Sequence, residues 1–110
     1  MERPLKGDVV VIPFPFSDLS QSKRRPALVV ATLPGEDLIL CQITSRDRGD
    51  TDAIALHEAD FISGGLNRPS FACPARLFTA NRSLVLYKPG TLRPESMRAV
   101  TDKIIEILTR

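Results

Sequence analysis

Apolar residues occur along this chain in short runs that predict β-strands. The run from Asp8 to Ile12 is rich in β-branched side chains, and its unbroken apolar stretch is typical of a strand buried on both faces. Two further runs, 26–31 and 38–44, are separated by a Pro-Gly-Glu-Asp segment at 34–37 that favours a tight turn. The spacing predicts that these two runs form a β-hairpin.

Prolines and glycines divide the remaining sequence into shorter extended segments. Pro13 and Pro15 are expected to end the first strand, leaving 17–25 as a polar loop. A short edge strand is expected at 53–56, and the residues at 63–69 favour a turn. The pattern then predicts one strand over 70–79, bulged or at an edge because Pro74 interrupts it, and an extended segment at 83–88 that Pro89-Gly90 ends.

The last segment changes to a helical period. One stripe carries the apolar residues Met97, Val100, Ile104, Ile107 and Leu108, with polar residues opposite. Pro94 suits a first helical turn, so a helix is predicted over 94–109. The whole pattern indicates a single domain over residues 1–110, mainly antiparallel β-sheet, closed by one amphipathic helix.

Composition is that of an ordinary globular protein. The chain has 110 residues, of which 43% are hydrophobic and 25% charged, which excludes a disordered chain. No apolar run approaches membrane-spanning length, and residues 1–6 contain no apolar stretch typical of a signal peptide. We therefore expect a cytoplasmic protein that does not interact with membranes.

The residues that bind metals or act as nucleophiles are few. Cys41 and Cys73 lie in apolar, strand-like surroundings and are expected to be thiols, although a disulfide stays open. Together with the single histidine, His57, they match no zinc pattern. Asp50 and Asp52 are interpreted as a solvated turn. No metal and no cofactor are expected.

Positive charge is clustered although the net charge is only +2. The clusters are 23–25, Arg46 with Arg48, and Arg76 with Arg82. They would form a polyanion-binding face if the fold brought them together, but a scattered, solvated surface is an equal alternative. Base-stacking phenylalanines are a further option, for which the candidates are Phe14, Phe16, Phe71 and Phe78, but a core position is the favoured interpretation for all four.

One phosphoryl-transfer reaction suits these residues without a metal. Cleavage of RNA by its own 2′-hydroxyl needs a proton acceptor, a proton donor for the leaving oxygen, and positive charge on the phosphorane. An arginine fork can bind two phosphoryl oxygens at once. A hydroxyl from Thr44 or Ser45 could donate a hydrogen bond to another oxygen.

Three motifs, in order, resemble the MazF/PemK toxin family. They are Gly7-Asp8-Val9-Val10, Arg24-Arg25-Pro26-Ala27-Leu28-Val29-Val30 and Gln42-Ile43-Thr44-Ser45. A later Gly90-Thr91-Leu92 before the amphipathic helix is also similar, so the resemblance extends over about residues 6–108.

This resemblance implies an SH3-like bent antiparallel β-barrel closed by the helix and assembled as a homodimer. It further implies a toxin that causes growth arrest by cutting single-stranded RNA, including mRNA, at short sequences. The cut needs no metal, and it leaves 2′,3′-cyclic phosphate and 5′-hydroxyl ends. A cognate antitoxin would silence the toxin by covering its RNA groove.

Residue roles follow from the same resemblance. Arg25, directly before the proline, matches the catalytic arginine, and Thr44 matches the threonine that stabilises the transition state. The expected RNA contacts rest on proximity or on the basic clusters, and they are Lys23, Arg24, Ser45, Arg46 and Arg76. The general base is not identified, and His57 is a candidate by its pKa range alone.

Two departures from the family pattern keep an alternative open. The first loop is shorter than in many members, and Ala75 stands where some relatives carry an acid. A non-catalytic SH3-like module that binds RNA or a peptide is therefore the competing hypothesis. A DNA-binding regulator is disfavoured because one helix cannot form a helix-turn-helix motif.

Overall fold

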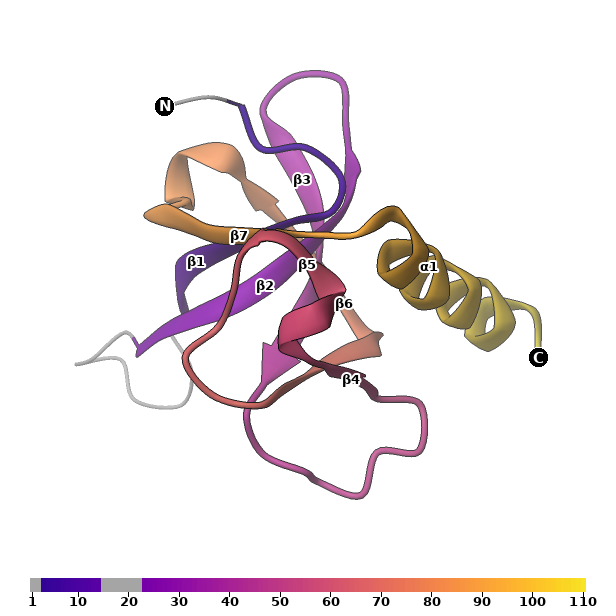
Figure 1. Ribbon diagram of the computed structural model, residues 1–110. Coiled ribbons are helices and arrows are strands. Elements are labelled where there is room, and N and C mark those ends of the chain that lie inside the picture. The colour runs from indigo at the N-terminus through magenta and orange to yellow at the C-terminus, as the bar shows by residue number, and fades with distance from the viewer. Residues whose placement is uncertain (1–2, 15–22) are drawn as a thin grey trace.

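The computed structural model, which describes residues 3–14 and 23–110, consists of one strongly curved antiparallel sheet and one long helix (Figure 1). The strands are β1 (Asp8–Phe14), β2 (Lys23–Thr32), β3 (Asp37–Thr44), β4 (Ile54–Leu56), β5 (Phe61–Gly64), β6 (Ser70–Asn81) and β7 (Tyr87–Leu92). Two short 3-10 helices, η1 (Glu58–Asp60) and η2 (Arg82–Leu84), and the helix α1 (Pro94–Thr109) complete the described chain. The predicted fold class is confirmed.

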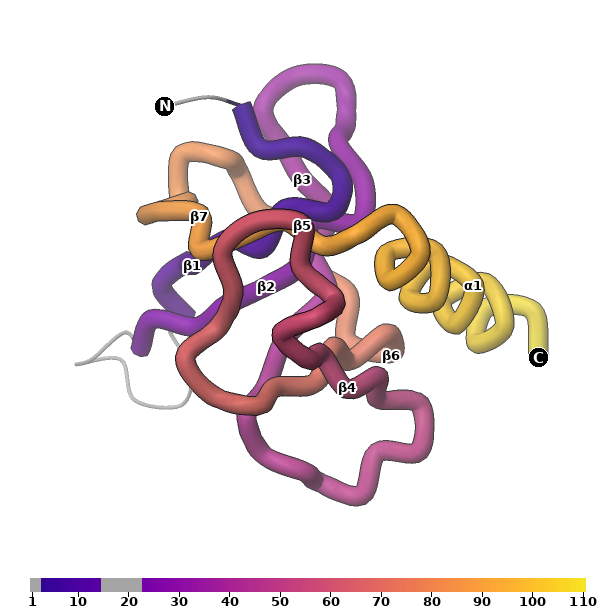
Figure 2. The backbone as a smooth tube through the Cα atoms, in the orientation of Figure 1, coloured from indigo at the N-terminus to yellow at the C-terminus, as the bar shows by residue number. Residues whose placement is uncertain are grey.

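The order of the strands explains why the sheet curls. It is β4-β6-β3-β2-β1-β7-β5, so β4 and β5 lie at opposite edges. Only residues 57–60 separate these two edge strands in the sequence. The two edges must therefore lie close together, and the backbone trace shows the sheet closing into a half-barrel (Figure 2).

Side chains alternate between two apolar cores, one on each face of the sheet. Val9 and Leu28 belong to the core that α1 covers with Met97 and Val100. Val10 belongs to the second core, on the opposite face. Because β1 contributes to both cores, its continuous apolar run is buried on both faces, as predicted.

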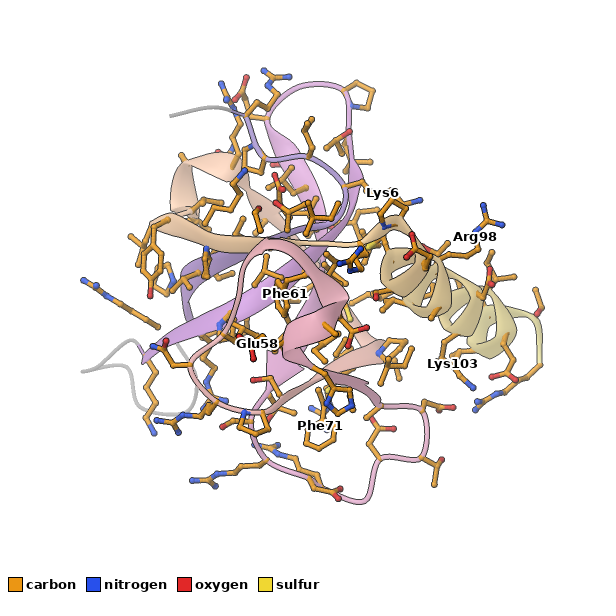
Figure 3. All side chains as sticks on the ribbon, in the orientation of Figure 1. Lys6, Glu58, Phe61, Phe71, Arg98 and Lys103 are labelled. Atoms are coloured by element: carbon orange, nitrogen blue, oxygen red, sulfur yellow. The ribbon has the colours of Figure 1, made fainter. Side chains whose placement is uncertain are left out.

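The helix begins and ends where its sequence pattern predicts. Pro94 occupies the first turn, where a missing N–H costs nothing. Only Met97 and Val100 of α1 are buried. Arg98 projects from the outer side of the helix, away from the sheet (Figure 3). Among the described residues, no helix has the length and apolarity needed to span a membrane.

Prolines end fewer strands than predicted. β1 continues through Pro13 to Phe14, and β2 begins at Lys23, because Pro13 pairs with Arg24 and Phe14 with Lys23. Residues 23–25, predicted as loop, are therefore strand. The rest of the predicted loop, 17–22, lies outside the described residues, as do Pro15 and Phe16.

A wide bulge and two missed segments account for the other differences. Between the pairs Cys41↔Leu77 and Gln42↔Cys73, β6 contains three extra residues, so the bulge predicted at Pro74 is confirmed. The prediction that Pro89-Gly90 ends a strand is wrong, because β7 runs through both residues. A bulge in the β1 pairing accommodates Pro89 there. β5, whose last two residues were predicted as part of a turn and whose first two carried no prediction, pairs with β7 through Phe61↔Leu92.

Candidate functional site

The two residues predicted to be catalytic lie at the same end of neighbouring strands. β2 and β3 pair antiparallel, and their last register pair at this end is Ala27↔Gln42. Arg25 is two residues beyond that pair on β2, and Thr44 is two residues beyond it on β3. Since side chains alternate along a strand, both project to the same side, and both line one groove.

Thr44 is held in a defined position at the end of β3. It pairs with Phe71 of β6, and the residue is 8% exposed. Its Oγ1 accepts a hydrogen bond from the backbone N–H of Arg46 over 3.1 Å. Because a hydroxyl can accept and donate at once, the Thr44 O–H can still donate to a group in the groove.

The groove is strongly cationic. It has a volume of about 390 Å³. Among the described residues that line it, none is acidic and six are basic: Lys23, Arg24, Arg25, Arg46, Arg48 and Arg68. Ser45 also lines the groove. Two of the basic clusters identified in the sequence, 23–25 and 46 with 48, thus meet here, which gives a site suited to a polyanion.

The far wall of the groove comes from the segment between β5 and β6. Leu66, Asn67, Arg68 and Ser70 contribute to it. Ser70 is only 4% exposed, and its Oγ donates a hydrogen bond to the carbonyl of Arg68 over 3.0 Å. This bond fixes the backbone that carries Arg68 at the head of β6.

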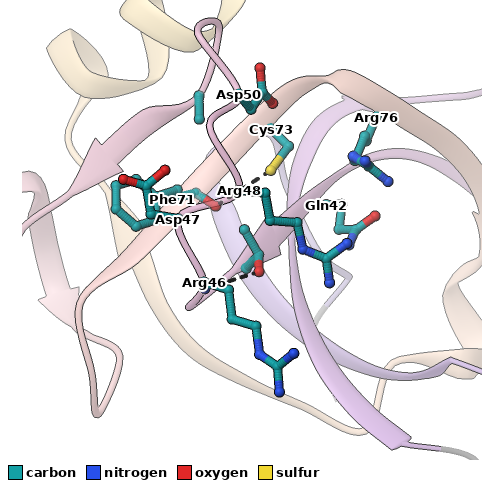
Figure 4. A pocket seen from close by; sticks show the side chains of 10 residues that line it. Gln42, Arg46, Asp47, Arg48, Asp50, Phe71, Cys73 and Arg76 are labelled. Atoms are coloured by element: carbon teal, nitrogen blue, oxygen red, sulfur yellow. Dashed lines mark hydrogen bonds between the residues drawn. The ribbon is translucent and has the colours of Figure 1, made fainter.

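Arg76 is not in the groove with Arg25. It projects from the β6 bulge into a smaller adjoining pocket, which also contains Gln42, Asp50 and Cys73 (Figure 4). Three residues line both cavities: Thr44, Arg46 and Arg48. Arg76 is therefore a neighbour of the groove and adjoins it through these three shared residues.

The other basic and titratable candidates lie apart from Arg25. Arg82 forms an ion pair with Glu36 in the turn between β2 and β3, at the opposite end of the hairpin. His57 lines a second hollow on the far side of Arg68 and does not line the Arg25 groove. In the described part of the chain, no group of three His, Cys, Asp or Glu side chains converges as metal ligands would.

Both cysteines are free, buried thiols. Burial raises the pKa of Cys41 to about 12. Burial, and secondarily the charge of Asp50, raises the pKa of Cys73. Neither thiol is poised to act as a nucleophile at neutral pH, in agreement with the sequence interpretation.

Comparison of the sequence with models of known protein families identifies the family of this chain. The model of the PemK-like, MazF-like toxin of type II toxin-antitoxin systems matches residues 5–108. The chain belongs to this toxin family. The match extends over nearly the whole chain, so the resemblance carried by the ordered motifs is confirmed.

Solved structures of similar fold include several toxins. A chain of the MazE–MazF complex from Deinococcus radiodurans (Form-II) superposes with a TM-score of 0.77 at 21% identity, covering 99% of this chain and 98% of that one. An endoribonuclease in complex with its cognate antitoxin, from a mycobacterial species, gives 0.73 at 16% identity, with coverage of 99% and 96%. Mycobacterium tuberculosis toxin MazF-mt6 gives 0.70 at 18% identity, with coverage of 93% and 96%. These likenesses establish a shared fold.

No curated protein sequence matches the chain. Within this PemK-like, MazF-like toxin, four polar residues of the groove were absent from the set of site residues predicted from the sequence: Arg48, Asn67, Arg68 and Ser70. Arg48 belonged to a recognised basic cluster. Asn67 and Arg68 belong to the predicted turn and Ser70 begins the strand after it, and only the curling of the sheet brings these residues opposite Arg25.

Proposed function

We propose that this family member is an endoribonuclease that cuts single-stranded RNA in a sequence-specific, metal-independent manner. The products are a 2′,3′-cyclic phosphate end and a 5′-hydroxyl end. The observation that supports the proposal is that Arg25 and Thr44, from neighbouring strands, line one cationic groove. A flexible polyanion with an internal nucleophile is the substrate class that such a groove suits.

The reaction is a transesterification within the RNA. The 2′-oxygen attacks the adjacent phosphorus and loses its proton to a base, while the bond from phosphorus to the 5′-oxygen breaks. The 5′-oxygen takes up a proton and leaves as a hydroxyl. In this mechanism the Arg25 guanidinium neutralises charge that grows on two non-bridging oxygens, and the Thr44 hydroxyl donates to one of them.

The surrounding cations have a different role. Lys23, Arg24 and Arg46 line the same groove as Arg25 and are proposed to bind flanking phosphates, with Ser45 as a further donor. Arg76 faces the adjoining pocket, so its proposed RNA contact lies in that pocket, which Thr44 also lines. These contacts raise affinity and orient the RNA, and they carry little sequence information themselves.

The proposed partners follow from the family and the neighbouring structures. Two of the structural neighbours are complexes of an endoribonuclease with its antitoxin and of MazF with MazE. We propose that an antitoxin likewise silences this chain, that the chain is a homodimer, and that it acts in the cytoplasm. A protein that covered the cationic groove would compete directly with RNA.

The test is incubation of a long RNA with the purified protein in excess EDTA, followed by analysis of the fragment ends. We expect discrete fragments with cyclic phosphate and 5′-hydroxyl ends. Arg25→Ala should lower the cleavage rate on the order of 100-fold or more, because it removes charge from the transition state. Thr44→Val, which keeps the side-chain shape, should lower it about 10-fold or more by removing the donor to the phosphate together with the bond that Thr44 accepts from the Arg46 N–H.

The matched control is Arg98→Ala, which removes the same charge from the outer side of α1. Arg98→Ala should cleave RNA as fast as the wild type. In a separate experiment, induction of Arg25→Ala in a growing bacterium should no longer arrest growth. Full activity of a folded Arg25→Ala variant would contradict its catalytic role. RNA that is bound but left intact by the wild type would identify a non-catalytic binding module instead.

A further inference from the structure

The cationic groove continues past Arg68 into a second hollow. This hollow has a volume of about 380 Å³ and lies between the end of β4, η1, β5 and the segment before β6. Leu66, Asn67 and Arg68 line both the groove and the hollow. The two cavities therefore share one ridge, and a strand bound in the groove can pass over that ridge into the hollow.

The hollow has an apolar floor and a polar rim. Leu56 and Phe61, which are 5% and 7% exposed, contribute to its floor together with Leu66. Glu58 and Asn67 contribute polar groups. Glu58 and Phe61 lie close together at η1 and the start of β5 (Figure 3). An apolar floor with a few polar groups suits the flat face and polar edge of a nucleobase.

The ridge between the cavities is fixed by the sheet beneath it. The N–H of Gly65 donates to the carbonyl of Pro89 over 3.2 Å, and Ser70 holds the carbonyl of Arg68. Asn67 and Arg68 therefore lie between two anchored points. A contact site held in this way loses little conformational entropy when a ligand binds.

The ridge and the hollow carry charges of opposite sign. Arg68 is exposed, and within the described residues no carboxylate lies within 4.0 Å of its side chain. Glu58 places a negative charge in the hollow. A phosphate is therefore attracted to the ridge and repelled from the hollow, whereas a neutral base that carries hydrogen-bond donors fits the hollow.

We propose that the hollow is a base-recognition subsite for the nucleotide next to the cleaved bond. Arg68 binds that nucleotide's phosphate, and the base packs on Phe61 and Leu66. Glu58 and the Asn67 carbonyl accept hydrogen bonds from an exocyclic amino group, so bases with such a group are preferred over uracil. This inference rests on the proposed ribonuclease function and names the feature of the substrate that the site selects.

The first test measures base preference separately from catalysis. The cleavage site is mapped on a long RNA, and oligonucleotides containing it are made with a 2′-deoxy nucleotide at the cleaved bond, so that they bind without reacting. At one flanking position, replacing cytosine by uracil or adenine by unsubstituted purine should weaken binding about 10-fold. In Glu58→Ala and Asn67→Ala this penalty should shrink to less than 3-fold, as a double-mutant cycle requires of two coupled groups.

The second test measures the phosphate contact. For single strands, each phosphate contact contributes about 0.7 to the slope of log affinity against log salt concentration. Arg68→Ala should reduce the slope by about that amount and leave the base preference unchanged. Arg98→Ala, with the same loss of charge away from the groove, should reproduce the wild-type slope and affinity.

Three results would overturn the subsite. The first is a loss of affinity on base replacement that is equal in wild type and Glu58→Ala. The second is a salt dependence of affinity in Arg68→Ala equal to that of Arg98→Ala. The third is loss of antitoxin binding by Glu58→Ala with unchanged base preference. The last result would assign the hollow to the protein partner. If the wild type neither binds nor cuts RNA, the ribonuclease function itself fails, and this outcome is distinct from the other three.

Discussion

The carboxylate of Asp60 joins η1 to the first turn of α1. Its Oδ2 accepts the backbone N–H of His57 over 2.7 Å, and its Oδ1 accepts the hydroxyl of Ser96, also over 2.7 Å. These two hydrogen bonds, the His57 bond first, hold the pKa of Asp60 below its ordinary value. The folded chain therefore binds this proton less readily than the unfolded chain does, and folding is favoured while Asp60 is ionised.

Asp60→Asn should lower the free energy of unfolding by about 1–2 kcal/mol at pH 7, because the amide nitrogen cannot accept a hydrogen bond. A lowered pKa stabilises the fold above the ordinary aspartate value and loses its effect as pH falls through the folded value. The difference from wild type should thus be complete above about pH 5 and shrink below about pH 4. Urea unfolding across this pH range measures it.

Glu106→Gln is the control for this experiment. The pKa of Glu106 is also lowered, mainly by Lys103, but the pair lies on the exposed side of α1. Exposed ion pairs contribute little to stability, so this variant should unfold as the wild type does. An Asp60→Asn deficit that stayed constant from pH 7 to pH 3 would contradict the assigned role of the carboxylate.

A site residue could be located from the sequence only where the residues next to it in the chain have a clear pattern. Arg25 and Thr44 could be placed from the sequence because each adjoins a strand with a clear apolar pattern, and a hairpin aligns the ends of its strands. Arg68 could not, because nothing near it in the sequence indicates that the sheet closes and carries it opposite Arg25. Arg76 was named from its basic cluster, but its place in the adjoining pocket follows from the β6 bulge, which the sequence indicated without showing where the side chain would lie.

Among the elements, the short strand β5 depends most on glycine. Gly64, at its end, has a positive φ of 66°. A Cβ at this position would lie 1.9 Å from the carbonyl oxygen of Pro89 in β7. Only glycine allows β5 and β7 to approach this closely, and the segment that carries Asn67 and Arg68 continues from that contact.

Gly64→Ala should therefore destabilise the protein by about 2–4 kcal/mol, combining backbone strain with a clash against a neighbouring strand. Chemical denaturation measures the loss. Gly35→Ala is the matched control, because Gly35 also has a positive φ, of 90°, but nothing lies within 4 Å of its added Cβ. Equal losses in the two variants would show that the close approach of β5 to β7 contributes nothing.

The same contact explains which elements the sequence pattern could not predict. Strands with several apolar residues, such as β1 and β3, were recognised, and so was the helix with its sustained period. β5 and the end of β7 contain serine, glycine and proline, which favour turns locally. They are strands because β5 pairs with β7 and β7 pairs with β1. Pairing between segments far apart in the sequence cannot be predicted from the local pattern of residues.

For the molecule as a whole, the two faces of the sheet are covered unequally. The helix α1 covers one core, whereas the second core opens into a largely apolar groove of about 470 Å³. Leu77 and Leu84 line this groove and are 37% and 45% exposed. Arg76 lines it as well, so the groove adjoins the pocket next to Thr44. We propose this face as the homodimer interface.

Leu77→Asp and Leu84→Asp should each weaken the dimer on the order of 100-fold, because a twofold interface removes the exposed part of each leucine twice and would bury two unpaired carboxylates in an apolar contact. Analytical ultracentrifugation over a concentration series measures the dissociation constant. Leu108→Asp is the control, since Leu108 is 73% exposed on α1 and outside this groove, and it should leave the dimer unchanged. A monomeric wild type, or a dimer as tight in Leu77→Asp as in Leu108→Asp, would place the interface elsewhere. If the groove variants are folded monomers, their RNA affinity shows whether the pocket beside Thr44 needs the second subunit.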